Sequence, residues 1–202
     1  MEKSILKQSV FNLDFVAADN FDAIINDIIH NTDTTHFPVV ITPNVDLTVH
    51  LNKNKKLLPV FQNARYILPD GAPIIWFSKL LGKPLKKRLA GSDLFPLIWK
   101  AGIQHQKKMF LILPNDIVKT QLTLEYPTAQ CYIPPFFEAT AEEVEKEAQQ
   151  IFPLLQLQQP DFVFLGLRYP KQEMLIINLH EKLNQKNIKL PVFFNLGASY
   201  EF

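Results

Sequence analysis

The feature that most constrains the fold is the regular alternation of short, almost wholly apolar runs with longer segments of helical periodicity. The apolar runs, each expected to form a strand, are residues 9–15, 37–42, 65–69, 107–113, 129–134, 160–166 and 190–195. Runs that lack polar alternation are typical of parallel strands covered on both faces. The order strand, helix, strand along the chain predicts an α/β fold: a Rossmann-like, doubly wound, mostly parallel sheet with helices on both faces.

Helical segments are expected between these strands. They cover residues 19–31, 44–56, 72–82, 92–104, 115–125 and 170–184, together with one helix that a capping box opens at Thr140. We expect this last helix to end near Phe152, because Pro153 lacks the backbone N–H that continues a helix and would stop or kink it.

Length, charge and cysteine content narrow the class of protein. The 202 residues are enough for one domain with a real core, and we expect a single domain over residues 1–202. Twenty-one basic and 20 acidic residues give a net charge of +1, which predicts no nucleic-acid partner. The single cysteine, Cys131, cannot form an internal disulfide, and no apolar run is long enough to span a bilayer. These features favour a cytoplasmic protein.

In doubly wound sheets, ligands bind beyond the carboxyl ends of the strands, so the residues that follow each strand are candidates for a site. Asp70-Gly71 is the sharpest of these signals. A carboxylate at a strand end is partly desolvated, which makes it a better general base. The alternative is a turn or a cap for the helix that follows, because Asp and Gly are common turn residues.

Arg88 is the second candidate and lies in the only tight basic cluster, formed with Lys83, Lys86 and Lys87. A guanidinium can bind a diphosphate with two parallel hydrogen bonds, and the helix that begins nearby would add to the attraction. The alternative is a solvated basic loop in which Ser92 or Asp93 caps that helix.

Four further side chains follow strands, and each has an ordinary structural alternative. Thr42 and Asn44 are able to orient a sugar or a base, although Asn44 suits the cap of the next helix equally well. Gln172 is placed to reach a ligand, whereas Glu173 suits the first turn of a helix on electrostatic grounds. Aromatic side chains such as Phe136 either stack on a base or belong to the core.

Several familiar sites are excluded by the sequence. No two of the six glycines are separated by a single residue, so the dinucleotide-binding G-x-G-x-x-G pattern does not occur. Neither H-E-x-x-H nor a Cys/His zinc spacing is present. The D-x-D pair that holds a divalent ion in many nucleotide-sugar transferases is also missing. A diphosphate leaving group would then be stabilised by Arg, Lys or backbone N–H groups.

Taken together, these motifs resemble one family over nearly the whole chain. The matching motifs are Thr42-Pro43-Asn44, Pro69-Asp70-Gly71, Arg88-Leu89-Ala90-Gly91-Ser92-Asp93, Pro134-Pro135-Phe136, Pro160-Asp161 and Pro170-Lys171-Gln172-Glu173. Their order and spacing are similar to those of the WecG/TagA/CpsF family, which is glycosyltransferase family 26. Each piece is weak alone, but the combination is specific.

The resemblance implies an inverting, metal-independent glycosyltransferase that needs no cofactor. It would move N-acetylmannosamine or another hexose from a UDP-sugar to an undecaprenyl-diphosphate-linked sugar in the synthesis of bacterial surface polysaccharides. Asp70 would be the catalytic base. The substrate-binding residues that the resemblance implies are Thr42, Asn44, Gly71, Arg88, Gly91, Asp93, Gln172 and Glu173.

The chain departs from the family pattern in two places. Leu167-Arg168-Tyr169 stands where many members have a glycine, which favours an altered donor choice. Family members also continue into a basic, amphipathic C-terminal segment thought to contact the membrane, and this sequence stops at Phe202. We expect peripheral association with the inner face of the cell membrane, weakened by the missing tail.

Other interpretations remain open at this stage. The missing tail favours a nucleotide-sugar-binding partner subunit with weak catalysis as the main alternative, and a carboxylate-dependent hydrolase is a more distant one. Trp76, Phe77 and Trp99 lie on expected helices and would expose apolar patches, which favours homo-oligomerisation.

Overall fold

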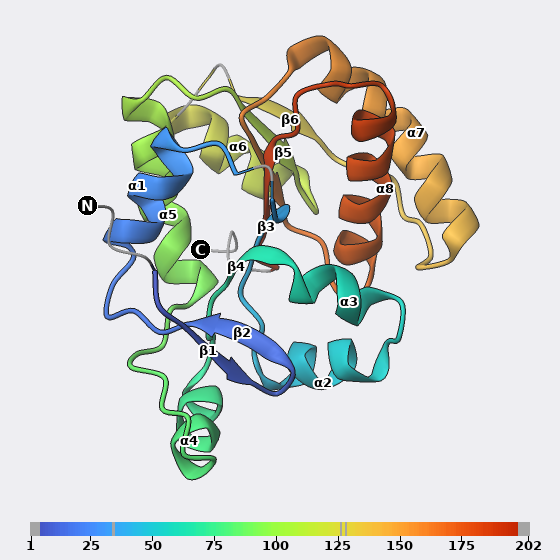
Figure 1. Cartoon of the computed structure of the whole chain (residues 1–202). Coiled ribbons are helices and arrows are strands. Elements are labelled where there is room, and N and C mark those ends of the chain that lie inside the picture. Colours follow the sequence, from blue (N-terminus) through green and yellow to red (C-terminus); the bar gives the residue numbers. More distant parts are fainter. Residues whose placement is uncertain (1–4, 34, 126, 128, 198–202) are drawn as a thin grey trace. The chain divides into compact units, whose positions relative to one another are not determined.

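The computed structural model describes residues 5–33, 35–125, 127 and 129–197, and contains two compact units. The first unit covers residues 1–101 and the second covers residues 102–202, so the boundary falls within one helix, α5 (Gly91–Gln104). Each unit is an α/β structure with its own strands and helices (Figure 1).

The first unit holds four strands in the order β1-β2-β4-β3. Its elements are β1 (Lys7–Val10), β2 (Leu13–Val16), α1 (Asp22–His30), β3 (Phe37–Ile41), α2 (Val45–Lys53), α3 (Leu57–Gln62), β4 (Ala64–Ile67), α4 (Ala72–Leu80) and most of α5. Strands β2, β4 and β3 are parallel, and only β1 runs antiparallel to its neighbour. Every residue of β3 and β4 is buried, as the apolar runs predict.

The second unit holds four parallel strands in the order β8-β7-β5-β6. Its elements are β5 (Met109–Ile112), α6 (Asp116–Glu125), β6 (Gln130–Tyr132), α7 (Ala141–Gln158), β7 (Phe162–Leu165), α8 (Lys171–Gln185) and β8 (Val192–Asn195). The core is rich in phenylalanine, and the rings of Phe164 and Phe194 stack with their centroids 4.6 Å apart. Helices α7 and α8 pack against each other (Figure 1).

Both units are doubly wound. In the second unit the chain moves outward from β5 to β6 and then back to β7 and β8. Right-handed crossovers in opposite directions place their helices on opposite faces, so α6 covers one face while α7 and α8 cover the other. The same reversal in the first unit separates α1 from α2 and α3. The predicted Rossmann-like α/β class, with a mostly parallel sheet and helices on both faces, is therefore confirmed.

The single strand predicted over residues 9–15 is wrong. The segment is the hairpin of β1 and β2, because Phe11 and Asn12 both adopt positive φ angles of 52° and 59°. Asn tolerates this conformation, whereas Phe rarely does. Two side chains hold the turn: Asn52 donates to the Phe11 carbonyl at 3.0 Å, and Gln62 donates to the Asn12 carbonyl at 2.8 Å.

Three further expectations need correction. The helix expected over residues 44–56 is α2, which ends earlier, at Lys53, and a helix that was not predicted, α3, follows at Leu57. Helix α7 does not end near Phe152 but continues through Pro153, which lies on its exposed side while the buried Ile151 and Leu155 continue its packing face. Trp99 exposes no patch: it is only 2% exposed and packs against Phe95.

Candidate functional site

Three segments of the first unit meet beyond the carboxyl ends of β3 and β4. The Asp70 N–H donates to the Pro43 carbonyl at 3.3 Å, which ties the loop after β4 to the loop after β3. The Leu89 N–H donates to the Pro69 carbonyl at 2.8 Å, which brings in the segment that contains Arg88. The strand ends thus assemble the three strongest sequence motifs at one edge, as the fold rule predicts.

Asp70 and Arg88 form an ion pair at this edge. Arg88 Nε lies 3.3 Å from Asp70 Oδ1, and the side chains are 48% and 26% exposed, respectively. Asp70 Oδ2 and the two terminal amino groups of Arg88 have no partner among the residues that the structure describes. The pair therefore leaves one carboxylate oxygen to accept a proton and a guanidinium fork to bind an anion.

Of the two structural alternatives for Asp70, the structure shows the turn but not the helix cap. The N-cap of α4 is Gly71, with a φ of +95° and no side-chain cap hydrogen bond. Only glycine adopts that angle readily, and it turns the chain sharply from β4 into the helix. Asp70 is thus held at the turn by its backbone, while its side chain pairs with Arg88 rather than capping the helix.

Thr42 and Asn44 lie in the loop that Asp70 contacts. Thr42 is buried at 8% exposure directly after β3. Asn44 is exposed and caps α2, since its Oδ1 accepts from the Leu47 N–H at 2.9 Å, so the capping interpretation is confirmed. Capping uses the amide oxygen and leaves the Asn44 Nδ2 group with no partner in the described part of the chain. Asn44 is therefore able to cap the helix and donate to a ligand at once.

Gly91 and Asp93 occupy the start of α5. Gly91 is buried as the first residue of the helix, and the exposed Asp93 lies in its first turn. Both Ser92 and Asp93 are inside the helix rather than preceding it, so the alternative in which one of them caps this helix is wrong. Asp93 stabilises the helix through the partial positive charge at its N-terminus.

Gln172 and Glu173 lie in the second unit and are buried at 4% and 0% exposure. Glu173 Oε1 accepts from Gln172 Nε2 at 3.2 Å and from Asn195 Nδ2 at 3.1 Å. Burial raises the pKa of Glu173, and these hydrogen bonds offset the rise only in part. Glu173 does lie in the first turn of α8, as expected, but its complete burial shows that it is more than a surface carboxylate at a helix end.

This buried cluster contains polar atoms that are not paired within the described residues. Gln172 Oε1, Glu173 Oε2 and Asn195 Oδ1 are all buried without a hydrogen-bond partner there. Three unpaired acceptors call for donors, and a protonated Glu173 supplies one. Asn195 was not singled out from the sequence. Its only signal there is a polar residue at the end of an apolar strand.

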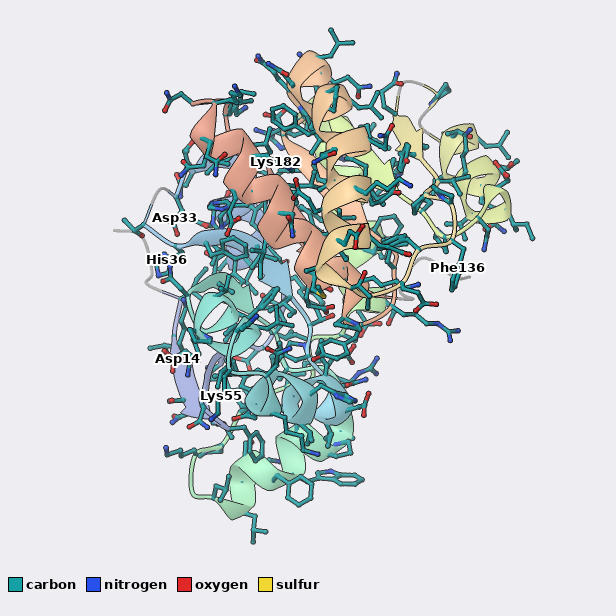
Figure 2. All side chains as sticks on the ribbon, turned by 90° about the vertical axis from the view of Figure 1, so that its right-hand side faces the viewer. Asp14, Asp33, His36, Lys55, Phe136 and Lys182 are labelled. Atoms are coloured by element: carbon teal, nitrogen blue, oxygen red, sulfur yellow. The ribbon has the colours of Figure 1, made fainter. Side chains whose placement is uncertain are left out.

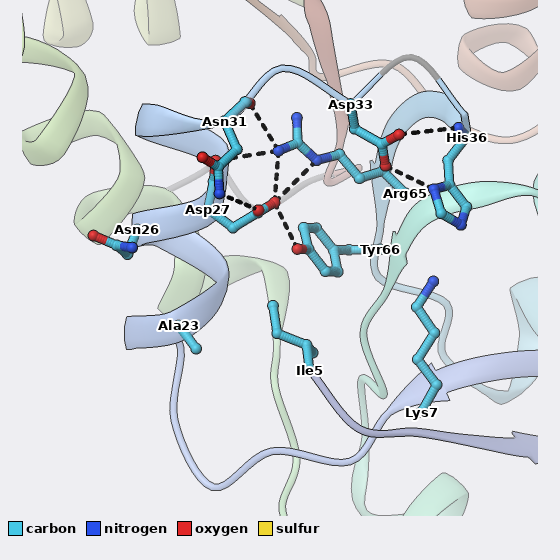
Figure 3. Close-up of a pocket in the computed structure, with 10 residues that line it drawn as sticks. All are labelled: Ile5, Lys7, Ala23, Asn26, Asp27, Asn31, Asp33, His36, Arg65 and Tyr66. Atoms are coloured by element: carbon cyan, nitrogen blue, oxygen red, sulfur yellow. Dashed lines mark hydrogen bonds and ion pairs between the residues drawn. The ribbon is translucent and has the colours of Figure 1, made fainter. Parts of the chain in front are cut away.

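A second Asp–Arg pair was also missed, and it lines a cavity of about 370 Å³ in the first unit (Figure 3). Arg65 is buried within β4 and contacts Asp27 of α1, with Nη2 and Oδ2 only 2.6 Å apart. Arg65 Nη2 also donates to the Asp27 and Asn31 carbonyls, and Tyr66 Oη donates to Asp27 Oδ2 at 2.7 Å. This network explains how an apolar strand carries an arginine.

The exposure of Phe136 excludes one of its two interpretations, that it belongs to the core. Phe136 follows β6 and is 84% exposed, so it does not belong to the core, and Figure 2 shows it at the surface. Lys171 Nζ lies 4.4 Å from the centre of its ring.

Among the described residues, no group of three His, Cys, Asp or Glu side chains is placed to hold a metal ion.

Comparison with known proteins decides the family. The model of the "Glycosyl transferase WecG/TagA/CpsF family" matches residues 8–202. The chain belongs to this family. The match includes every candidate site residue of both units, so the motifs that suggested the resemblance are part of a relationship along the whole chain.

Two relatives of this WecG/TagA/CpsF member carry the same name, N-acetylglucosaminyldiphosphoundecaprenol N-acetyl-beta-D-mannosaminyltransferase. The protein of Bacillus spizizenii is 27% identical over 198 residues, which is 94% of this chain and 71% of the relative. The protein of Staphylococcus aureus is 26% identical over 163 residues, which is 80% of this chain and 61% of the relative. This chain thus spans somewhat under two thirds of the staphylococcal protein.

Proposed function

We propose that this WecG/TagA/CpsF member transfers N-acetylmannosamine or a similar hexose from a UDP-sugar to an undecaprenyl-diphosphate-linked sugar. The observation that carries the proposal is the Asp70–Arg88 pair, whose unused carboxylate oxygen and guanidinium fork supply the two groups that such a reaction needs. Family membership and the names of the two relatives support the substrate classes. The reaction would serve the synthesis of a bacterial surface polysaccharide.

The chemistry is a single displacement at the anomeric carbon of the donor. Asp70 Oδ2 accepts the proton of the acceptor hydroxyl, and the hydroxyl oxygen forms a bond to that carbon. The bond from the carbon to the diphosphate oxygen breaks on the opposite face, so the configuration inverts and UDP leaves with the electron pair. The terminal amino groups of Arg88 stabilise the negative charge that develops on the diphosphate. The leaving group is thereby stabilised without a metal ion.

The remaining candidates have positioning roles in this proposal. Asn44 Nδ2 and the Thr42 hydroxyl donate to the donor sugar or its base, and Gly71 allows the backbone to turn close to the substrate. Gly91 and Asp93 shape the start of α5 beside Arg88. In the second unit, Gln172 and Glu173 are further candidates for binding a ligand, through the unpaired oxygens of their buried side chains.

The test is a transfer assay with the full chain, UDP-N-acetylmannosamine and undecaprenyl-diphosphate N-acetylglucosamine, with the product detected by mass spectrometry. A calorimetric titration with UDP and ADP, first with EDTA and then with Mg²⁺, accompanies it. We expect selective UDP binding and transfer in both conditions. A requirement for Mg²⁺ would overturn metal independence, and no UDP binding would overturn the proposal.

One outcome would select the main alternative. Metal-independent UDP binding without transfer to any lipid-linked acceptor would indicate a nucleotide-sugar-binding partner subunit. Sugar release without an acceptor would instead indicate a hydrolase.

A further inference from the structure

The segment from Asp70 to Arg88 is an excursion that leaves the body of the first unit and returns to the same point. The hydrogen bond from the Leu89 N–H to the Pro69 carbonyl and the Asp70–Arg88 ion pair close its neck. Between them lie α4 and the loop 81–87, and Figure 1 shows α4 projecting from the strands of this unit. We call residues 70–88 the α4 excursion.

The outward face of α4 is more apolar than a solvent-facing helix requires. Four large side chains on this face are exposed: Trp76 by 66%, Phe77 by 49%, Leu80 by 81% and Leu81 by 54%. Positions 76, 77, 80 and 81 lie on one stripe at helical spacing. The inward face is formed by Ile74, Ile75 and Ser78, which are buried, so the helix is apolar on both sides.

Apart from Asp70 at its start, the charged residues of the excursion are all basic. Between Asp70 and Asp93 the sequence contains five basic residues and no acidic one, although the whole chain carries only +1. Arg88 pairs with Asp70 and Lys86 pairs with Asp19. The other three, Lys79, Lys83 and Lys87, are exposed and have no acidic partner among the described residues.

The apolar stripe and the lysines are held in a fixed relation to one another. The Leu85 N–H donates to Ser78 Oγ at 3.0 Å, and the Lys83 N–H donates to the Ser78 carbonyl at 2.9 Å. The buried Leu85 side chain anchors the same loop. The ring of Phe77 meets that of Phe11 edge to face, with centroids 6.5 Å apart, which fixes α4 against the hairpin turn.

We propose that the α4 excursion is a membrane-docking surface, which inserts Trp76, Phe77, Leu80 and Leu81 at the surface of a bilayer that contains anionic lipid. Apolar insertion combined with basic charge gives the two signals that stable peripheral binding needs. A second copy of the chain suits the face poorly, because a twofold contact would bring the unpaired lysines of one copy against those of the other. The excursion begins and ends at the Asp70–Arg88 pair, so docking would hold that pair close to the lipid surface. This inference rests on the proposed function in one respect, which is that the acceptor is a lipid-linked sugar held in the membrane.

The protein carries its own spectroscopic reporter for the test. It has two tryptophans, and Trp99 is 2% exposed whereas Trp76 is 66% exposed. We expect the emission of the full chain to shift to the blue when vesicles of phosphatidylcholine and phosphatidylglycerol are added, but not with phosphatidylcholine alone. Trp76→Phe should abolish the shift and leave vesicle binding nearly intact in a flotation assay.

Two sets of variants separate the two signals. Trp76→Ser/Phe77→Ser/Leu80→Ser should lower vesicle binding at least tenfold, on the order expected for three inserted apolar side chains. Lys79→Gln/Lys83→Gln/Lys87→Gln should lower it by about fivefold for each lysine. The matched controls are Leu157→Ser, at an equally exposed leucine of α7, and Lys55→Gln/Lys56→Gln, and both should bind as the unmodified chain does.

Transfer assays distinguish failure of this inference from failure of the proposed function. The triple serine variant of α4 should lose transfer to an acceptor embedded in vesicles and keep transfer to a water-soluble, short-chain acceptor. Vesicle binding through α4 without any transfer would sustain the docking surface and overturn the proposed function. Vesicle binding that the serine variant retains would overturn the inference. So would sedimentation that shows a dimer lost in this variant with no vesicle binding, since the face would then pair with a second copy.

Discussion

Two Asp–Arg pairs lie in the first unit, and they differ in how completely their atoms are used. In the Asp27–Arg65 pair, Arg65 is 4% exposed and bonds to a carboxylate and two carbonyls, while Tyr66 donates to the same carboxylate (Figure 3). In the Asp70–Arg88 pair, a single contact of 3.3 Å joins two partly exposed side chains. The first pair makes several hydrogen bonds, from Arg65 Nε and Nη2, whereas the second makes one and is open.

This difference indicates which pair is structural and which is available for chemistry. A buried guanidinium needs hydrogen-bond partners for most of its donors, because each unpaired group costs free energy of folding. Burial alone would raise the pKa of Asp27, but hydrogen bonds from Asn31, Tyr66 and Arg65 more than offset it and hold that pKa below its ordinary value. An open pair contributes little to the stability of the fold, and its unpaired donors and acceptors are available to a ligand.

The largest expected effect is on catalysis by the open pair. Asp70→Asn keeps the shape of the side chain but removes its ability to accept a full proton, so kcat should fall by about a hundredfold to ten-thousandfold. The free energy of unfolding should change by less than about 1 kcal/mol, because an exposed ion pair adds little stability. Steady-state transfer kinetics and urea unfolding measure the two quantities.

A control variant checks that the comparison is specific. Asp27→Asn should show the reverse pattern, with a loss of stability and nearly unchanged kcat in the folded fraction. Transfer by Asp70→Asn at the rate of the unmodified chain would contradict the role given to Asp70.

The second prediction tests the arginines. Arg65→Met should lower the free energy of unfolding by about 2–3 kcal/mol, somewhat below the usual loss for a broken buried pair because Asp27 is 27% exposed. Arg88→Met should lower it by less than about 1 kcal/mol. Equal losses in urea unfolding would remove the distinction between a buried, multiply bonded pair and an open one.

The smallest effect extends the comparison to a buried carboxyl group without a cationic partner. Because burial raises the pKa of Glu173 above 4.5, the folded state keeps a proton that the unfolded chain releases. The stability contributed by this group is therefore complete below about pH 4.5 and is lost as the pH rises through the folded pKa. Asp27 has the opposite sign, since its lowered pKa gives stability that is lost as the pH falls.

Glu173→Gln should remove this pH dependence. Its amide cannot ionise, and its N–H groups are able to donate to the unpaired oxygens of Gln172 and Asn195. We expect a gain of about 1 kcal/mol at pH 8 and no gain at pH 4, measured by urea unfolding. A gain that is equal at both pH values would show that Glu173 does not titrate as burial implies.

Much of the fold could be predicted because the strand segments are apolar along almost their whole length, which indicates burial on both faces. Runs such as residues 37–42 and 160–166 have no polar alternation and became fully buried parallel strands. Local backbone conformation was less visible. The positive φ of Phe11 depends on Asn52 and Gln62, which lie some 40 to 50 residues away, so nothing within the run 9–15 distinguishes a hairpin from one strand. Pro153 likewise misled because neighbouring buried side chains, rather than the proline, decide where α7 ends.

The same contrast holds for the site: positions at strand ends could be predicted from the sequence, whereas contacts between residues distant in the chain could not. Strand ends placed Thr42, Asp70 and their loops at one edge of the first unit, because the carboxyl ends of adjacent parallel strands converge. The Arg65–Asp27 network and the Asn195–Glu173 contact join residues 38 and 22 positions apart. Their partners cannot be paired by spacing along a single sequence. The roles of the site residues stay predictions that the variants above test.

The closed neck of the α4 excursion has a consequence for how such enzymes diversify. Because the Pro69–Leu89 hydrogen bond fixes the two ends, the exposed side chains between them are able to change without displacing β4 or α5, whereas the buried Ile74, Ile75 and Leu85 are not. Exchanging only the exposed positions of α4 between relatives is thus a route to altering where an enzyme of this kind works while leaving its strand scaffold and the Asp70–Arg88 pair intact.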